Sequence, residues 1–399
     1  MQKKERRLAY IVKDTKTYMN AEEARYKYSG TDDDNILFIV IPKYMNNNLS
    51  QRMRETLKEE LWDEVVWIYT WSNCVTENEK NSSNKNRYSR FFNEVKEFFY
   101  NYLDRRKLDE IATGYTPCEL VFSAHKNTQE HLAAKLNPEK LFLVDSGHRI
   151  FKRINKNGFI DYSRWFISRS RFTRYLFWFT GFKVFDRNRT SLFTVYADEI
   201  VTKHKVEKNN FEYQNYLLST RQIGSEVVWI STPIYAMVEG VKIDDYILYI
   251  KSYLNHLNIS PDKLIYVPHP GKQTRNEIEY IQNELKCRVD DRDIPVEFKI
   301  SNYLKLPRAC ISPFSSALVN IDVASGGRIA TLSAWHFEYN FFELWLNWKK
   351  DVEKNPELHI QFIELSECRP LFYIDDIRTE RPLYSNFKDW QIKSYAKKR

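Results

Sequence analysis

The sequence predicts an α/β protein made of two doubly wound domains. Short apolar runs alternate along the chain with longer segments of helical spacing, which is the pattern of parallel strands joined by helical crossovers. This alternation occurs twice, before and after a joining segment at roughly residues 190–220. A chain of 399 residues with 43% hydrophobic residues, aromatic residues included, can fill two hydrophobic cores.

The first series of elements predicts a domain over residues 1–205. NILFIVI at 35–41 and EVVWIYTW at 64–71 are strand-like, and LSQRMRETLKEELW at 49–62 has helical spacing. Strand, helix and strand in this order form a parallel crossover unit. A second helix is expected in RFFNEVKEFFYNYLDRR at 90–106, followed by strands in CELVFSA at 118–124 and KLFLVDSG at 140–147.

The second series predicts a domain over residues 206–399. Strands are expected in EVVWIST at 226–232, KLIYVPHP at 263–270, VEFKI at 296–300 and ACISPFSS at 309–316. Helices are expected in DDYILYIKSYLNHL at 244–257 and RNEIEYIQNEL at 275–285. Ligands of doubly wound domains gather beyond the carboxyl ends of the parallel strands, so residues that follow these strands are the first candidates for a site.

The composition argues against several classes of protein. No apolar run approaches the roughly 20 residues of a membrane span, and the start MQKKERRLAY has no apolar segment typical of a secretion signal, so we expect a cytoplasmic protein. The absence of GxGxxG and GxxxxGK[ST] gives dinucleotide and ATP sites no support. The cysteines form no CxxC pair and are expected to be buried thiols rather than disulfides or zinc ligands: Cys74, Cys118, Cys287, Cys310 and Cys368.

A basic aromatic segment covers residues 149–190 of the expected first domain. Lys and Arg dominate it, with Asp161 and Asp186 as its acids, and it contains RSRFTRYLFWFTGFK at 169–183. Arginines beside aromatic rings suit an anionic membrane surface, and we expect peripheral contact through residues 164–183. A buried helix with basic edges is an equal alternative, and stacking on single-stranded nucleic acid is the weakest one. We expect no nucleic-acid partner.

His269 lies between two prolines in IYVPHPGK at 265–272, directly after an apolar run. Proline disfavours the helical region for the residue before it, so His269 is expected in extended backbone at the end of a strand. An imidazole that titrates near neutrality can give a proton to a leaving phosphate there. A single histidine at a strand end is more often structural, so the motif needs support from elsewhere.

Ser315 and Ser316 supply that support in ACISPFSSALVNI at 309–321, where Pro313 ends a strand and a helix begins. Hydroxyls and backbone N–H groups at a helix start can bind an anion, although the pair could equally be a plain helix cap. We expect this pair and His269 at neighbouring strand ends. Two groups suited to phosphate at such a place predict a nucleotide-sugar site.

The motifs LFLVDSG, IYVPHPGK, IPVEFKI and SPFSSAL, in this order over roughly residues 140–320, resemble the bacterial sialyltransferases. The resemblance is to the lipooligosaccharide sialyltransferase family and its capsule-building relatives. It implies a GT-B fold, in which two Rossmann-like domains face each other across a cleft. It also implies an inverting transfer of sialic acid, or a related nonulosonic acid, from a CMP-activated donor to a terminal sugar of a lipooligosaccharide or capsule precursor.

The same resemblance implies roles for residues of the second domain. His269 would act on the leaving CMP phosphate, and Pro270, Ser315 and Ser316 would bind that phosphate. Glu297, in the PVEF segment, falls where the family has an acidic residue near the nucleotide.

The general base has two candidates, Glu239 and Asp145. Related enzymes carry two acids before a glycine in the first domain, whereas this chain has Ser146 between Asp145 and Gly147. In the lipooligosaccharide branch the base follows a small-residue–Pro turn, here STPIYAMVEG at 231–240, whose nearest carboxylate is Glu239. A sugar hydroxyl needs such a base at neutral pH, and we favour Glu239.

No metal or other cofactor is expected. TDDDN at 31–35 and DDRD at 290–293 contain Asp-x-Asp triplets of the metal-binding kind, but both lie in polar, turn-like segments, and a CMP donor has one phosphate. Asp244 and Asp245 open a helix and are expected to cap it. The alternatives to sialyl transfer are a GT-B enzyme for another activated sugar, such as glucose or Kdo, and a basic aromatic membrane-binding or RNA-binding protein without catalysis.

Overall fold

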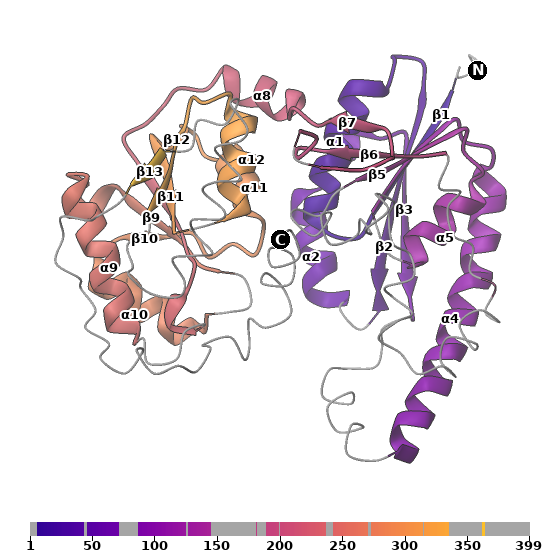
Figure 1. Ribbon diagram of the computed structural model, residues 1–399, viewed down its shortest axis with the longest axis horizontal. Coiled ribbons are helices and arrows are strands. Elements are labelled where there is room, and N and C mark those ends of the chain that lie inside the picture. The colour runs from indigo at the N-terminus through magenta and orange to yellow at the C-terminus, as the bar shows by residue number, and fades with distance from the viewer. Residues whose placement is uncertain are drawn as a thin grey trace. The chain divides into compact units, whose positions relative to one another are not determined.

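A computed structural model of the protein divides into two compact units, Met1–Asn209 and Asn210–Arg399. The boundary falls a few residues beyond the expected one between residues 205 and 206. In the described residues each unit contains one parallel β-sheet with helices on both faces (Figure 1). The structure describes residues 6–43, 46–71, 87–124, 127–144, 181, 189–198, 200–236, 242–269, 273–313, 315–334 and 361–363.

The sheet of the first domain has the strand order β3-β2-β1-β4-β5-β6-β7 among the described residues. Its strands are β1 (Arg7–Val12), β2 (Asp34–Pro42), β3 (Glu64–Thr70), β4 (Leu120–Ala124), β5 (Lys140–Val144), β6 (Thr190–Thr194) and β7 (Val206–Lys208). Helices α1 (Thr15–Tyr28) and α2 (Asn46–Thr56) cover one face, and α4 (Arg87–Tyr115) and α5 (Asn127–Lys135) cover the other (Figure 1). This is the order of a doubly wound domain.

Burial and capping explain these elements. Every residue of β2 after Asp34 is buried, as expected for a central strand packed on both faces. Helix α1 begins with a capping box, in which the Asp14 carboxylate accepts from Thr17 N at 2.8 Å and Thr17 Oγ1 accepts from Asp14 N at 3.2 Å. The predicted helix at 49–62 begins earlier and ends at Thr56, and a 3₁₀ turn (Glu59–Leu61) follows it.

The sheet of the second domain has the order β10-β9-β8-β11-β12-β13 among the described residues. Its strands are β8 (Val227–Ile230), β9 (Leu264–Val267), β10 (Arg288–Val289), β11 (Ala309–Ser312), β12 (Ala330–Ala334) and β13 (Gln361–Ile363). Helices α9 (Ile243–His256) and α10 (Arg275–Leu285) lie on one face. Helices α11 (Val296–Ser301) and α12 (Ser316–Ser325) lie on the other, and α8 (Glu212–Ser219) contacts both of them (Figure 1).

Two expectations about elements are wrong. The predicted strand VEFKI is the helix α11, and the two-residue strand β10 occupies the edge of the sheet instead. Residues 297 and 299 would point the same way in a strand, whereas a helix turns them about 200° apart. Glu297 thereby reaches Asn320, and Lys299 reaches Asp290. The joining segment at 190–220 contains β6, β7 and α8, so it is more structured than a linker.

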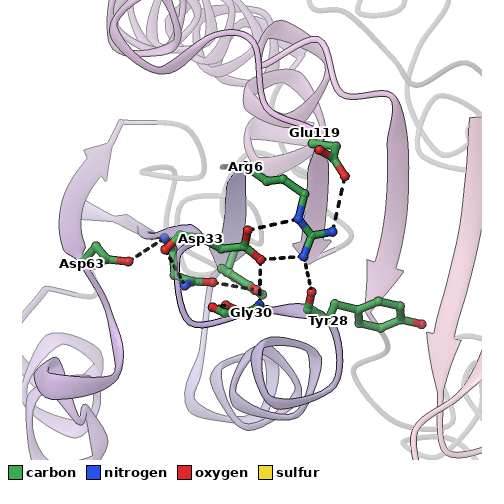
Figure 2. Close-up of polar contacts among 9 residues, drawn as sticks. Arg6, Tyr28, Gly30, Asp33, Asp63 and Glu119 are labelled. Carbon is green, nitrogen blue, oxygen red and sulfur yellow. Dashed lines mark hydrogen bonds and ion pairs between the residues drawn. The ribbon is translucent and has the colours of Figure 1, made fainter. Parts of the chain in front are cut away.

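Charged residues cluster at the amino edge of the first sheet, just before three of its strands (Figure 2). The Arg6 guanidinium donates to both oxygens of Asp33, at 3.0 and 2.6 Å, and to Glu119 at 3.4 Å. It also donates to the carbonyl oxygen of Tyr28, the last residue of α1, at 3.1 Å. Burial alone would raise the pKa of Asp33, but hydrogen bonds from Arg6 and from the Gly30 N–H outweigh burial and lower it.

The prediction of an α/β protein with two Rossmann-like doubly wound domains is confirmed. The cleft expected between them depends on how the domains are placed and stays a prediction. Within the described residues, none of the helices combines the length and apolar character that a membrane crossing requires. Cys118, Cys287 and Cys310 are buried free thiols, as expected; Cys74 and Cys368 lie outside the described residues.

Candidate functional site

The second sheet has a topological switch point between β8 and β11. From β8 the chain continues to β9 and β10 on one side, and it returns to β11 and β12 on the other. Adjacent loops leave such a point in opposite directions, which makes the carboxyl ends of the two strands the expected ligand site. Two buried hydroxyls meet there, because Thr232 Oγ1 and Ser312 Oγ lie 3.2 Å apart in a hydrogen bond across the two strand ends.

His269 lies at this carboxyl edge, two residues after β9, and is half-buried. Pro268 ends the strand because it has no N–H to give to a neighbouring strand. The backbone N–H of His269 donates to Gln273 Oε1 at 2.8 Å. The Gln273 amide in turn donates to Tyr266 OH at 2.8 Å and to Tyr235 OH at 3.0 Å. The backbone that carries the imidazole is therefore tied to β9 and to the segment after β8.

A buried hydrogen-bond network continues from Tyr266 into the core. Tyr266 OH donates to Ser231 Oγ at 2.7 Å, and Ser231 Oγ lies 3.2 Å from Tyr246 OH. The indole N–H of Trp229 donates to Tyr246 OH at 3.1 Å. Burial raises the pKa of Tyr235 to about 12 and raises the pKa values of Tyr246 and Tyr266, so these phenols keep their protons near neutrality. The network is neutral and is shared between β8, β9 and α9.

Ser315 caps helix α12, which follows β11. Its Oγ accepts from Ala317 N at 3.2 Å and its backbone is extended, with φ −157° and ψ 133°. The alternative of a helix cap is therefore observed. The hydroxyl proton remains available as a donor, so the anion site stays a prediction. Ser316 is the first residue of the helix. The N-terminus of a ten-residue helix adds backbone N–H groups and a positive partial charge to this edge.

The expectation that His269 and the serine pair lie at neighbouring strand ends is wrong in detail. Strand β8 lies between β9 and β11, so the two motifs flank the strand that ends at the switch point. The motif order along the chain could not show this, because β8 precedes both strands in sequence and is inserted between them in the sheet. The arrangement brings Ser231 and Thr232 between the two predicted motifs.

Glu297 belongs to the first turn of α11 and is half-buried. Its Oε1 accepts from Asn320 Nδ2 at 2.7 Å, and Asn320 is a buried residue of α12. The carboxylate thus links α11 to the helix that begins with the serine pair. The expected position near the nucleotide stays a prediction.

A second charged cluster forms where β10 ends, beside β9. Asp290 accepts from Arg292 at 2.6 and 2.8 Å and from Tyr303 OH at 2.8 Å, and the buried Lys299 donates to its carbonyl oxygen at 2.6 Å. Burial lowers the pKa of Lys299 to about 8. Burial would raise the pKa of Asp290, but Arg292, Lys299 and Tyr303 together lower it. Both the carboxylate and the carbonyl oxygen of Asp290 thus have hydrogen-bond partners within the protein.

Several predicted residues lie outside the described residues: Asp145, Glu239, Pro270, and the segment 164–183 apart from Gly181. Their predictions stay open. Asp245 caps α9 as expected, accepting from Lys242 N at 2.8 Å, and Asp244 accepts from Tyr280 OH at 2.6 Å. His131 is fully buried against Asp109 in the first domain.

In the two segments that contain the Asp-x-Asp triplets, Asp34 is bonded to Arg7 at 3.1 Å, and the neighbouring Asp33 and Asp290 are bonded to Arg6 and Arg292. Across the described ranges, no group of three or more His, Cys, Asp or Glu residues has a geometry suited to a metal ion.

Sequence reasoning missed the residues that support His269. Gln273 gives no signal of its own, since it is a single amide before the helix cap Thr274. Tyr266 is indistinguishable from a core aromatic in LIYV. The hydroxyls of Ser231 and Thr232 could have been found, because they directly follow the first strand of the second series, where a doubly wound sheet places its switch point.

No protein-family model matches the chain, and a search of curated proteins finds no match. Among solved structures the chain is similar to a UDP-N-acetylglucosamine 2-epimerase, with 10% identity, TM-score 0.44, and 89% of each chain covered. It is also similar to the E. coli heptosyltransferase WaaC with ADP, with 9% identity, TM-score 0.38 and 90% of each chain covered. A third likeness is to the N-terminal domain of Candida albicans trehalose-6-phosphate phosphatase, with 8% identity and TM-score 0.40, covering 84% of this chain and 83% of that one. At such low identities and TM-scores these likenesses carry no argument about activity.

Proposed function

We propose that this protein is a metal-independent inverting glycosyltransferase that transfers sialic acid, or a related nonulosonic acid, from a CMP-activated donor. The acceptor is a terminal sugar of a glycolipid or oligosaccharide precursor of a surface glycan. The observation that carries the proposal is the carboxyl edge of the second sheet, where His269 and the Ser315-capped start of α12 flank the switch point. The order of the four resembling motifs supports the choice of a CMP donor.

In the proposed reaction, the acceptor oxygen bonds to the anomeric carbon while the bond from that carbon to the phosphate oxygen breaks. The bonding electrons leave with CMP, and the carbon develops oxocarbenium character. His269 donates a proton or a hydrogen bond to the departing phosphate, which lowers the barrier to departure. The base that takes the acceptor's proton is Glu239, or Asp145 if the first domain supplies it.

The start of α12 has the electrostatic role. Helix N–H groups and the hydroxyls of Ser315 and Ser316 neutralise phosphate charge without needing to reorganise during the reaction. Gln273 holds the backbone of His269, and the neutral network below it keeps that backbone fixed to β8 and β9. Because the buried phenols remain protonated, they place no negative charge next to the phosphate.

Isothermal titration calorimetry with CMP, UDP and GDP tests the nucleotide, and single-stranded RNA tests the non-catalytic alternative. We expect CMP to bind and the others to bind at least tenfold more weakly. Preference for UDP or GDP would favour the same fold acting on another activated sugar. Binding of RNA alone would contradict an enzyme of this kind.

Two variants of Ser315 separate phosphate binding from helix capping. Ser315→Asp keeps a capping carboxylate, so stability should be retained, but its charge should repel the phosphate and abolish CMP binding. Ser315→Ala should destabilise the domain by about 1 kcal/mol through the lost cap. Normal CMP affinity in folded Ser315→Asp would exclude the start of α12 as the phosphate site.

A further inference from the structure

An exposed group of aromatic and apolar side chains lies on α4 and at the end of β3 in the first domain. Phe99, Tyr102 and Leu103 are 61%, 37% and 48% exposed, and Trp71, directly after β3, is 38% exposed. Helical spacing puts residues 99, 102, 103 and 106 on one face of α4, while Asn101, Asp104, Leu108 and Ala112 bury the opposite face. This apolar face is turned away from the domain core.

The aromatic side chains of this face are held in place. The backbone N–H of Trp71 donates to the buried Asp104 carboxylate at 2.7 Å. The Trp71 ring stacks on Tyr100, with ring centroids 5.8 Å apart and planes 15° apart. Trp71 therefore presents an ordered ring beside the exposed side chains of α4.

Basic side chains border the same face. Lys43 Nζ lies 3.7 Å from the centroid of the Trp71 ring, Lys96 Nζ lies 5.9 Å from that of Tyr100, and the Arg105 guanidinium lies 5.5 Å from that of Tyr102. Arg106 is exposed one turn beyond Tyr102 and Leu103. We call these residues together the α4 surface: Lys43, Trp71, Lys96, Phe99, Tyr100, Tyr102, Leu103, Arg105 and Arg106.

The described acids of α4 offset this positive charge only in part. The Asp104 carboxylate is buried, and Asp109 is paired with Lys135 at 2.6 Å and with Arg105 at 3.5 Å, so the net positive charge comes from the other basic residues. Glu110 is exposed one turn beyond Arg106, towards the end of the helix. Between residues 98 and 107, the exposed charges of α4 are therefore positive.

We infer that the α4 surface docks on an anionic lipid bilayer. Tryptophan and tyrosine rings suit the boundary between headgroups and acyl chains, Phe99 and Leu103 can enter the apolar layer, and lysine and arginine reach anionic headgroups from its rim. A second copy of the chain is a less suitable partner for the α4 surface. A twofold contact would bring the basic residues of one copy close to those of the other, and their charges would repel. The inference uses no residue of the segment 164–183, of which the structure describes Gly181.

Co-sedimentation of the full chain with phosphatidylcholine vesicles, with and without phosphatidylglycerol, tests this inference. We expect binding to the anionic vesicles that weakens as salt is raised, because screening shortens the range of the attraction. Phe99→Ser with Leu103→Ser should lower the partition coefficient about tenfold or more, since it removes the inserted apolar groups. Lys96→Glu with Arg106→Glu should also lower it about tenfold or more.

Matched control changes lie in the second domain. Leu304 is 99% exposed and its neighbour Lys305 is also exposed, so Leu304→Ser and Lys305→Glu remove similar groups from another surface and should leave binding unchanged. Circular dichroism and thermal unfolding confirm that each variant folds. The assay needs neither sugar donor nor acceptor, so its outcome is separate from that of the proposed function.

Three results would overturn the inference. The first is unchanged vesicle binding by the folded Phe99→Ser, Leu103→Ser variant. The second is a dimer of the wild-type chain in sedimentation velocity that this variant converts to a monomer, without vesicle binding by either. The third is binding of single-stranded RNA, lost in both double variants, by a chain that ignores anionic vesicles.

Discussion

Charged side chains bond to one another at the amino edge of the first sheet (Figure 2), whereas neutral hydroxyl and amide groups hold the backbone of His269 at the carboxyl edge of the second. Helices of a doubly wound domain run opposite to its parallel strands. Their carbonyl ends therefore meet the amino edge, and their N–H ends meet the carboxyl edge. The carbonyl groups at the end of a helix need hydrogen-bond donors, and Arg6 supplies one by donating to the carbonyl oxygen of Tyr28, the last residue of α1. The N–H groups at the start of α12 need hydrogen-bond acceptors, and in the proposed function an anion supplies them.

Under the proposed function, this difference separates a structural cluster of charges from a binding site. Arg6, Asp33 and Glu119 occupy one another and the backbone, so the cluster stabilises the fold and offers little to a ligand. At the other edge, the groups below His269 are neutral and internally bonded, so they position the loop and would add no negative charge near the proposed phosphate. Under the proposed function, the direction of the strands is a better guide to the site than a concentration of charge.

The largest expected effect is on catalysis at the carboxyl edge. His269→Ala should reduce turnover with the CMP donor by roughly 10²- to 10⁴-fold, the range for loss of a general acid, without loss of stability. His256→Ala, at the exposed end of α9 in the same domain, is the matched control and should be near normal. Steady-state kinetics with protein of verified fold measures both, and near-normal turnover of His269→Ala would remove His269 from the mechanism.

A pH effect on stability is expected from the first domain. Burial lowers the pKa of His131 to about 4 from an ordinary value of 6.5, although Asp109 opposes the shift. On acidification the unfolded chain takes up this proton first, so the free energy of unfolding should fall between about pH 6.5 and 4, by about 2 to 3 kcal/mol. Asp109 has a lowered pKa and stays ionised in this range.

Urea unfolding of the full chain at several pH values measures this slope. His131→Gln keeps a hydrogen-bonding group next to Asp109 but cannot titrate, so its stability should change less over the same range. Equal slopes in the two proteins would show that His131 does not control the acid sensitivity.

Breaking the amino-edge cluster should affect stability rather than activity. Arg6→Met keeps much of the side-chain length but leaves the 5%-exposed Asp33 without its cation, which should cost about 2 kcal/mol of stability. Turnover per folded molecule should be unchanged at a temperature where the variant is folded. A specific loss of CMP binding or turnover in this variant would contradict the claim that the amino-edge cluster only stabilises the fold.

The smallest expected effect comes from the neutral network. Tyr266→Phe removes the hydroxyl that links Gln273 to Ser231, at a cost of about 1 kcal/mol in stability. Turnover should fall by less than in His269→Ala, because the imidazole remains but its backbone is less firmly held. Tyr280→Phe removes an exposed hydroxyl on α10 as a control. Thermal unfolding measures the change in stability, and steady-state kinetics measures the change in turnover. No change in either would show that the network contributes to neither.

The sequence predicted the repeated α/β pattern because buried parallel strands are nearly continuous apolar runs, as in NILFIVI and KLIYVPHP. It misassigned VEFKI, since Val, Phe and Ile favour strands locally while the contacts of Glu297 and Lys299 fix a helix. His269 and Ser315 were predicted from prolines and a helix start, which are local signals. Gln273 and Tyr266 were not, because their role depends on distances that only the folded chain sets.

Hydrogen–deuterium exchange with and without CMP tests the central claim, that the nucleotide phosphate binds at the carboxyl edge of the second sheet. Mass spectrometry of peptides reports each edge separately. We predict that CMP slows exchange in peptides covering residues 266–275 and 313–320, and leaves those covering residues 28–36 and 116–121 unchanged. Protection confined to the amino edge of the first sheet, or absent from both peptides of the second domain when CMP is saturating, would contradict the claim.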